Sequence, residues 1–155
     1  MPELSTHAVD VYPYREGAAG TEWLVVRRSV GHAYAGTWRM IGGKLDADEA
    51  AWETALRELA EETGFAPGRG LIELWALPSV NAHYQPGADR VVLAPAFAAR
   101  VEGDVRLDAE HDRAAWLPAE AAAERLAWPE QARLLQLAAR LASAERPVDW
   151  DVPLL

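Results

Sequence analysis

The stretch GKLDADEAAWETALRELAEETGF, residues 43 to 65, decides the fold of this chain. At about 100° per residue, its apolar side chains fall within one stripe of a helix. The members of that stripe are Trp52, Ala55, Leu56, Leu59 and Thr63. We therefore expect a helix over Asp48–Thr63 that packs on a core through this face. Gly64 should end it, because glycine readily adopts the positive φ of a helix C-terminus.

Three glutamates of the same stretch lie on another arc of this helix. Glu58 precedes Glu61 by three residues and Glu62 by four, so their side chains can converge. Two interpretations are open. A solvated acidic face is common on helices, since like-charge pairs cost only ~0.2–0.5 kcal/mol. The alternative is a site for Mg²⁺, a hard cation that takes oxygen ligands and bridges carboxylates to substrate phosphates.

The composition describes an acidic, cysteine-free globular domain. The chain has 155 residues, of which 50% are hydrophobic and 25% charged, and its net charge is -9. Such a charge disfavours nucleic acid polymers as partners, and an anionic substrate would need a bound cation or a basic patch. No apolar run reaches the ~18 residues that span a bilayer, and Met1–Asp10 lacks a signal-peptide pattern. We expect a cytoplasmic protein without a membrane partner.

The remaining segments alternate between strand-like and helical patterns. Strands are expected over residues 6–14, 23–28, 38–41, 71–77, 90–101 and 114–117, with a loop from 78 to 86. Helices are expected over 118–126 and 129–144, each beginning with proline. This order predicts one α/β layered domain over residues 1–145. The tail over 146–155 either straps onto the domain or a partner subunit, or frays.

The glutamates belong to a longer pattern, G-x5-E-x7-R-E-U-x-E-E-x-G-U, in which U is a bulky apolar residue. The chain matches this pattern at every position from Gly43 to Phe65. At roughly 7% per fixed residue, a chance match anywhere in the chain has a probability on the order of 10⁻⁶. The pattern is the Nudix box, and the chain resembles the Nudix hydrolases. The resemblance implies an α/β/α sandwich with a mixed sheet, and hydrolysis of a nucleoside diphosphate linked to another group.

The resemblance also implies roles for individual residues. Glu58, Glu61 and Glu62 match the metal ligands and belong to the catalytic group. Arg57 matches the residue that orients a catalytic glutamate, and Glu49 matches the residue that braces the preceding loop.

The residues themselves leave simpler roles open. Arg57 can form surface pairs with glutamates four positions away. Asp46 and Glu49 have the spacing of a capping box. Gly43 is a candidate for substrate contact, and it can equally supply turn geometry.

A further acid, Glu110, opens the stretch Glu110–Leu117, EHDRAAWL. Hydrolysis requires a base to activate water, and either a box glutamate or Glu110 can serve. In Nudix enzymes a carboxylate from the loop before a late strand often joins the metal site, and Glu110 matches that place. Glu-His followed by Trp-Leu also resembles the corresponding stretch of dihydroneopterin triphosphate and dATP pyrophosphohydrolases. The alternative for Glu110 is a solvated loop acid.

Several residues outside the box are candidates for substrate binding. Arg27 and Arg28 end a strand, so one can face phosphates while the other faces away. Trp38 and Tyr84 can stack on a base, although tryptophan more often belongs to a core. His83 is a weaker candidate of the same kind.

Together these observations predict hydrolysis of a pyrophosphate bond that depends on Mg²⁺, with Mn²⁺ as a substitute. The favoured substrate is a small nucleoside triphosphate-like molecule, cut to a monophosphate and pyrophosphate. Hydrolysis of ADP-ribose or dinucleoside polyphosphates is the alternative within the family. A catalytically silent nucleotide-sensing module is an alternative of another class, and a homodimer remains open.

Overall fold

A computed structural model describes residues 1–154; Leu155, the last residue of the tail, lies outside the described part. The strands are β1 (Glu3–Ser5), β2 (Ala8–Gly17), β3 (Gly20–Arg28), β4 (Trp38–Arg39), β5 (Ile41–Lys44), β6 (Ala66–Pro67), β7 (Gly70–Gln85), β8 (Arg90–Val101), β9 (His111–Leu117) and β10 (Asp151–Val152). The helices are α1 (Ala51–Thr63), α2 (Ala119–Arg125) and α3 (Pro129–Ala142), with short 3-10 turns at Pro86–Ala88 and Val148–Trp150.

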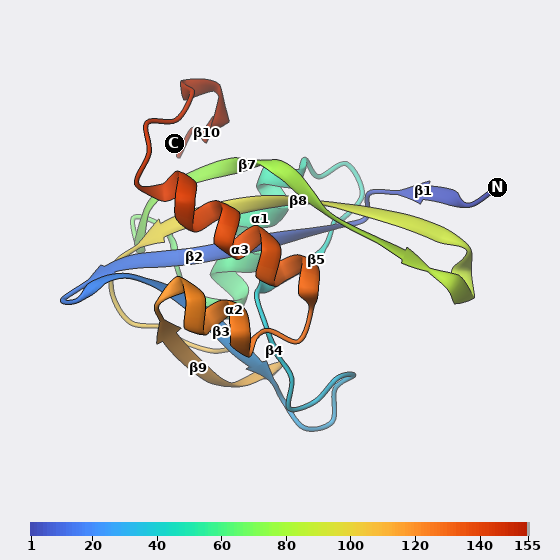
Figure 1. Ribbon diagram of the computed structural model, residues 1–155, viewed down its shortest axis with the longest axis horizontal. Helices are drawn as coiled ribbons and strands as arrows, with labels where there is room; N and C mark the ends of the chain where they lie inside the picture. Colours follow the sequence, from blue (N-terminus) through green and yellow to red (C-terminus); the bar gives the residue numbers. More distant parts are fainter. Residues whose placement is uncertain (155) are drawn as a thin grey trace.

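The strands form one mixed sheet with helices on both faces (Figure 1). Along the sheet the order is β10-β7-β8-β2-β3-β4, with β1 paired to β8, β5 to β2, β6 to β7 and β9 to β3. The central pair β2 and β8 is parallel, and each has an antiparallel neighbour on its other side. The α/β/α sandwich with a mixed sheet that the sequence predicts is therefore confirmed.

Two apolar cores lie on opposite faces of the sheet, because side chains along a strand alternate between its faces. Val9 and Val11 of β2 pack in one core with Leu59 of α1. Tyr12, next along β2, packs in the other core with Leu134 of α3. Helix α1, which carries the glutamates, thus packs on one face of the sheet, and α2 and α3 pack on the other.

Helix α1 begins at Ala51, so the start predicted at Asp48 is wrong. Asp48 has a φ of 65°, in the left-handed region, which interrupts a right-handed helix. The first turn is capped by Glu53, whose carboxylate accepts a hydrogen bond from the Ala50 amide at 3.0 Å. The predicted end is confirmed, since Gly64 has a φ of 83° and its amide donates back into the last turn.

The predicted core face of α1 is confirmed except at Trp52, with Leu56 partly buried against the core. Ala55, Leu59 and Thr63 are fully buried. Trp52 is 44% exposed, because it stands in the first turn beside the C-terminal tail, where it lines a groove with Trp150. Glu62, expected off the core face, is only 2% exposed.

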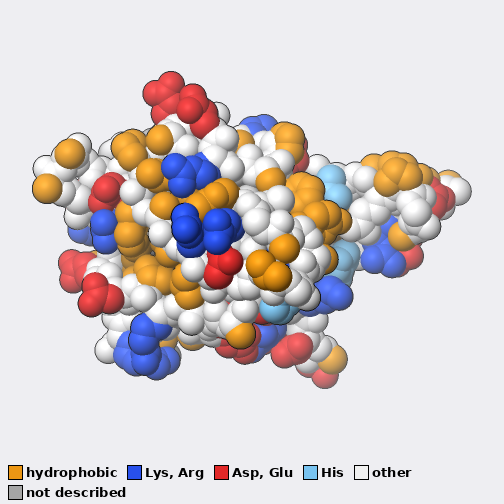
Figure 2. Space-filling view, turned by 90° about the horizontal axis from the view of Figure 1, so that it is seen from below, with side chains coloured by type: hydrophobic (Ala, Val, Ile, Leu, Met, Phe, Trp, Pro, Cys, Tyr) orange, Lys and Arg blue, Asp and Glu red, His pale blue; other side chains and the backbone are white. Residues whose placement is uncertain are grey.

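Strand β7 is the largest departure from the sequence analysis. After an irregularity between Ala76 and Val80, its pairing with β8 continues to Gln85, where a loop is expected. The end of this hairpin, with β1 alongside, forms an arm that projects from the body in both Figure 1 and Figure 2. Its surface carries Leu4 and Tyr84, which are 66% and 52% exposed. The arm is formed by pairing between β7 and β8, so it depends on a contact between two segments of the chain.

The late elements follow the predicted order with shifted bounds. β9 begins at His111, earlier than the strand predicted over 114–117. Pro118 precedes α2 as its N-cap, whereas Pro129 begins α3 as expected. The tail adds β10 to the edge of β7, and Val152 packs against the α1-side core. Within residues 1–154, none of the helices combines the length and apolar character that crossing a membrane requires.

Arg146 ties the tail to the domain. Its guanidinium donates to the Leu141 and Ala142 carbonyls at the end of α3, at 3.0 and 3.1 Å, and pairs with Glu73 at 2.9 Å. It also lies 4.1 Å from the centre of the Trp75 ring. We predict that Arg146→Ala lowers the free energy of unfolding in urea by roughly 1–3 kcal/mol, because helix-end, ion-pair and cation–π contacts are lost together.

Arg140, an exposed residue of the same helix, gives the matched control. Arg140→Ala should change the free energy of unfolding by less than about 0.5 kcal/mol. Equal effects of the two substitutions would show that the contacts of Arg146 do not anchor the tail.

Candidate metal centre and active site

The guanidinium of Arg57 joins the loop before α1 to the helix itself. It meets both carboxylate oxygens of Glu49 at 2.9 Å and donates to the Lys44 carbonyl at 2.9 Å. A third nitrogen lies 2.9 Å from Glu58 Oε1 and 3.5 Å from Glu61 Oε2. The hydrogen bonds from Arg57 are the first cause of a Glu49 pKa held down at about 2. Arg57 thus fixes the loop and one helix carboxylate at the same time.

Glu62 is a buried carboxyl group with little to compensate its charge. Its Oε2 accepts a hydrogen bond from the Gly42 amide at 3.0 Å. Burial raises the pKa of Glu62 to about 9, with a smaller increase from Glu58. Without a cation beside it, this side chain is a neutral carboxylic acid at pH 7.

Glu58 lies against strand β5 at a place that only glycine leaves open. A Cβ atom at Gly43 would collide with the Glu58 carboxylate, so Gly43 provides the space for this side chain. The side chain of Glu58 is 12% exposed, and burial is the main cause of its raised pKa. Glu61 is 56% exposed, so it stands at the rim of the group.

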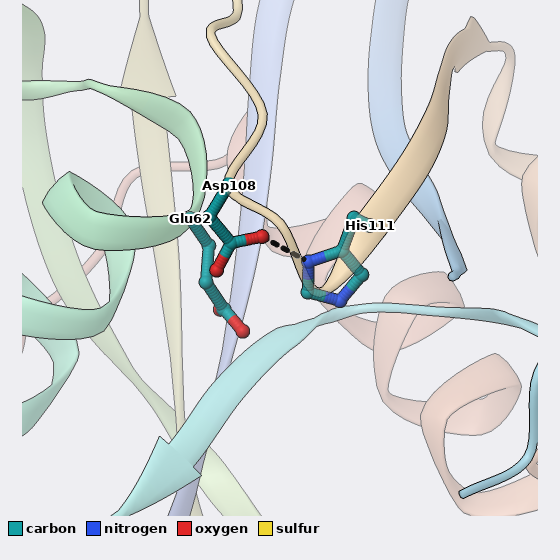
Figure 3. A group of neighbouring side chains, drawn as sticks. All are labelled: Glu62, Asp108 and His111. Carbon is teal, nitrogen blue, oxygen red and sulfur yellow. Dashed lines mark hydrogen bonds and ion pairs between the residues drawn. The ribbon is translucent and has the colours of Figure 1, made fainter. Parts of the chain in front are cut away.

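A turn of the loop between β8 and β9 brings further groups to the buried carboxyl. One oxygen of Glu62, one oxygen of Asp108 and one ring nitrogen of His111 all lie within 4.8 Å of one another. His111 Nδ1 donates to Asp108 Oδ1 at 2.9 Å, and Figure 3 shows this bond beside Glu62. His111 Nε2 is buried without a hydrogen-bond partner among residues 1–154. This grouping is not predicted from the sequence, although Asp108 and His111 lie within two residues of Glu110 along the chain.

Glu110 stands in the same turn and faces the helix glutamates. Its charge contributes to the raised pKa of Glu58. Its side chain is 48% exposed, and its carboxylate lies 3.5 Å from Arg28 Nη1. The loop therefore adds a fourth acid to the three on α1.

These residues fit a divalent cation. Glu58 and Glu62 are carboxylates that burial makes costly to ionise, and burial outweighs the neighbouring cations, Arg57 at Glu58 and Arg39 at Glu62, in its effect on their pKa. Carboxylate oxygens are also the ligands that Mg²⁺ and Mn²⁺ prefer.

The other candidates for substrate binding are distributed unevenly. Arg28, which is partly buried, lies on the side of Glu110, whereas Arg27 pairs with Asp112 at 2.8 Å. Trp38 is partly buried against the α2–α3 core and lies under the guanidinium of Arg125, 5.0 Å from it. Tyr84 donates to Asp89 at 2.7 Å near the tip of the arm, and the exposed His83 precedes it. No contact among the described residues joins Tyr84 or His83 to the glutamates.

A second polar group, centred on Asp10, lies across the sheet from the glutamates. Asp10 pairs in register with Gly42, whose amide holds Glu62. Its buried carboxylate accepts hydrogen bonds from the amides of Asn81 at 2.8 Å and Gln131 at 3.4 Å. Asn81 Oδ1 is buried with no partner in the described part of the chain. The sequence does not predict this group, because Asp10 lies within a strand and its partners Asn81 and Gln131 are distant in the chain.

Comparison with known proteins agrees with this geometry. The NUDIX domain family model matches residues 5–138, which is most of the chain. The chain belongs to the NUDIX family. The predicted Nudix membership is therefore confirmed.

Solved structures place the fold in the same family. A NUDIX hydrolase from Listeria monocytogenes has a TM-score of 0.69 and 26% identity, over 89% of this chain and 95% of that one. The dihydroneopterin triphosphate pyrophosphohydrolase of E. coli has a TM-score of 0.70 over 90% and 100% of the two chains; its 18% identity shows the fold alone. A curated relative, an octanoyltransferase from Myxococcus xanthus, is 34% identical over 112 residues, and the match spans 28% of that longer protein.

The buried carboxyl of Glu62 gives a prediction for stability. Its folded pKa of about 9 lies above the ordinary value of 4.5, so folding favours the protonated form. The stability that protonation contributes is complete below pH 4.5 and is lost as the pH rises toward 9. In chelator, Glu62→Gln should therefore gain stability over the wild type between pH 5 and 8, by up to roughly 4 kcal/mol at about 1.36 kcal/mol per pH unit.

Urea denaturation at several pH values measures this difference. Glu61→Gln, at the exposed rim, is the matched control and should follow the wild type across the range. If Glu62→Gln and the wild type lose stability in parallel, Glu62 is not a buried neutral acid in the metal-free protein.

Proposed function

We propose that this Nudix hydrolase cuts a nucleoside triphosphate-like substrate to a monophosphate and pyrophosphate, with Mg²⁺ as its cofactor. The observation that carries the proposal is the buried Glu62 with the partly buried Glu58, faced by Glu110 from the opposite loop. We further propose that the reaction takes place in the cytoplasm on a small, freely diffusing substrate.

The box residues divide into ligands and supports. Glu58 and Glu62, with Glu61 at the rim, would hold the cation. When bound, the cation supplies positive charge to the substrate phosphates and lowers the pKa of a bound water. Arg57 keeps Glu58 in place through their 2.9 Å contact, and Glu49 keeps Arg57 in place in turn.

Two residues outside the box complete the proposed centre. Glu110 is half exposed, and the one partner of its carboxylate within residues 1–154 is Arg28 at 3.5 Å, so it is available to accept the proton of the attacking water. Arg28 lies beside Glu110 and can meet a phosphate oxygen with its guanidinium. Arg27, which is engaged by Asp112, has no part in this proposal.

The substrate class is supported by the resemblance of Glu110–Leu117 to triphosphate pyrophosphohydrolases and by the polar group around Asp10. A nucleobase or pterin edge presents alternating N–H donors and carbonyl acceptors. In this group the Asp10 carboxylate already accepts from Asn81 and Gln131, and Asn81 Oδ1 is an acceptor left without a partner within residues 1–154, which could receive an N–H of such an edge. This group lies across the sheet from the proposed cation site, with Asp10 paired in register to Gly42.

The metal requirement tests the first part of the proposal. A triphosphate substrate is anionic and the groups around the proposed cation site are mostly acids, so without a cation the charge on its phosphates is not neutralised. We predict no measurable release of pyrophosphate in chelator, with recovery on adding Mg²⁺ or Mn²⁺ in excess. Full turnover in chelator would contradict the proposed centre, and metal-dependent nucleotide binding without turnover would indicate a silent sensing module.

The position of bond cleavage tests the second part. Water attacks the α-phosphorus, a new P–O bond forms there, and the bond to the bridging oxygen breaks as pyrophosphate leaves. In ¹⁸O-water we therefore predict one labelled oxygen in the monophosphate and none in the pyrophosphate, measured by mass spectrometry. Label in orthophosphate would reject this assignment. Cleavage of ADP-ribose or dinucleoside polyphosphates with triphosphates untouched would reject the substrate class and keep the hydrolase.

A further inference from the structure

Two side chains close the turn that carries Glu110, and the proposed function gives neither of them a role. Asp108 and His111 stand at the two ends of this turn, and His111 Nδ1 donates to Asp108 Oδ1 at 2.9 Å (Figure 3). The imidazole is fully buried. The backbone bond between the same two residues, from the His111 amide to the Asp108 carbonyl, is long at 3.5 Å. The side-chain bond is therefore the firmer of the two contacts that hold the turn closed.

Glu110 itself has little to hold its carboxylate. Its side chain is 48% exposed and its contact with Arg28 is 3.5 Å long. The firm contact of Glu110 is made by its backbone, because its carbonyl accepts a hydrogen bond from the Ser29 amide at 2.8 Å. The direction in which Glu110 points is consequently set by the backbone of the turn.

We propose that Asp108 and His111 are positioning residues, which fix the turn so that Glu110 faces Glu58 and thereby support hydrolysis through Glu110. The inference rests on the proposed function of Glu110. The hydrogen bond that closes the turn lies within this pair: the buried imidazole of His111 donates one N–H, and the carboxylate of Asp108 accepts it.

The closeness of Asp108 to Glu62 provides the rival explanation. One oxygen of each, with a nitrogen of His111, would make a separate cation site if Asp108 were a ligand. The two explanations ask different things of Asp108. An acceptor for His111 needs an oxygen at that place, whereas a ligand for a hard cation also needs the negative charge.

Three variants of the turn separate these explanations by kinetics. Asp108→Ala removes the acceptor and should lower kcat by about 10-fold or more, as loss of an orienting partner does at metal sites. Asp108→Asn keeps the acceptor oxygen and should stay within about 3-fold of the wild type, with an unchanged Mg²⁺ requirement. Asp104→Ala, at an exposed position of the same loop, is the control and should have no effect.

A double-mutant cycle with Glu110→Gln tests the route of action. Since the pair acts through Glu110, adding Asp108→Ala to Glu110→Gln should lower kcat by less than about 2-fold further. The same 10-fold loss in both backgrounds would overturn the inference. So would an Asp108→Asn enzyme as slow as Asp108→Ala with a raised Mg²⁺ requirement, which would make Asp108 a ligand. If Asp108→Ala does not fold, His111→Leu removes the donor instead and should show the same pattern.

Amide hydrogen exchange of the metal-free protein gives a readout that is independent of turnover. The Ser29 amide, which bonds to the Glu110 carbonyl, should exchange at least about 10-fold faster in Asp108→Ala and near the wild-type rate in Asp108→Asn. The Gly36 amide, bonded to the Arg28 carbonyl at 2.9 Å, is the internal control. Unchanged Ser29 exchange in Asp108→Ala would overturn the inference. Faster exchange in a protein whose wild type hydrolyses no triphosphate would overturn the proposed function and leave the turn-closing role standing.

Discussion

The Arg57 guanidinium is the cation around which the box is built. It binds Glu49 through both carboxylate oxygens, reaches the Lys44 carbonyl and holds Glu58. These contacts fasten the loop after β5 to helix α1 and fix the place where the helix meets the sheet. Glu62 lies outside these contacts: it accepts a hydrogen bond from the Gly42 amide, and burial outweighs the effect of Arg39 on its pKa. The fold therefore gathers more carboxyl groups than its own cations pair with, which suits the centre to a divalent cation.

Close backbone approach makes that gathering possible. Gly43 leaves the space that Glu58 fills, and a Cβ atom at Gly42 would meet the Val9 carbonyl of β2. Because α1 packs this closely on β5, the carboxyl of Glu62, four residues after Glu58, is buried against the sheet. Burial raises the pKa of Glu62 to about 9. The loop before β9 then closes over it with Asp108 and Glu110. The chemistry of the centre is in this sense a consequence of how tightly one helix packs on one strand.

The sequence predicts the features that depend on local spacing. Helix α1, its end at Gly64 and the convergence of the glutamates follow from positions three and four residues apart, and the box pattern gives the family. The burial of Glu62 does not follow, because helical geometry places it off the apolar stripe, and it is covered by packing against β5 and by the loop before β9. The continuation of β7 past Val80, and the approach of Asp10 and Asn81, depend on pairing between strands distant in the chain. Asp108 and His111 lie beside Glu110 in sequence, yet their proximity to Glu62, within 4.8 Å, arises only in the folded protein.

We propose that Glu62 is protonated in the metal-free centre and becomes a ligand when a cation binds. Calorimetric titration of Mg²⁺ or Mn²⁺ at pH 7, in two buffers of different ionisation enthalpy, measures the protons released on binding. With the Glu62 pKa at about 9, the wild type should release about one proton more per cation than Glu62→Gln, which should also bind the cation more weakly. Equal proton release and equal affinity in the two proteins would contradict the account.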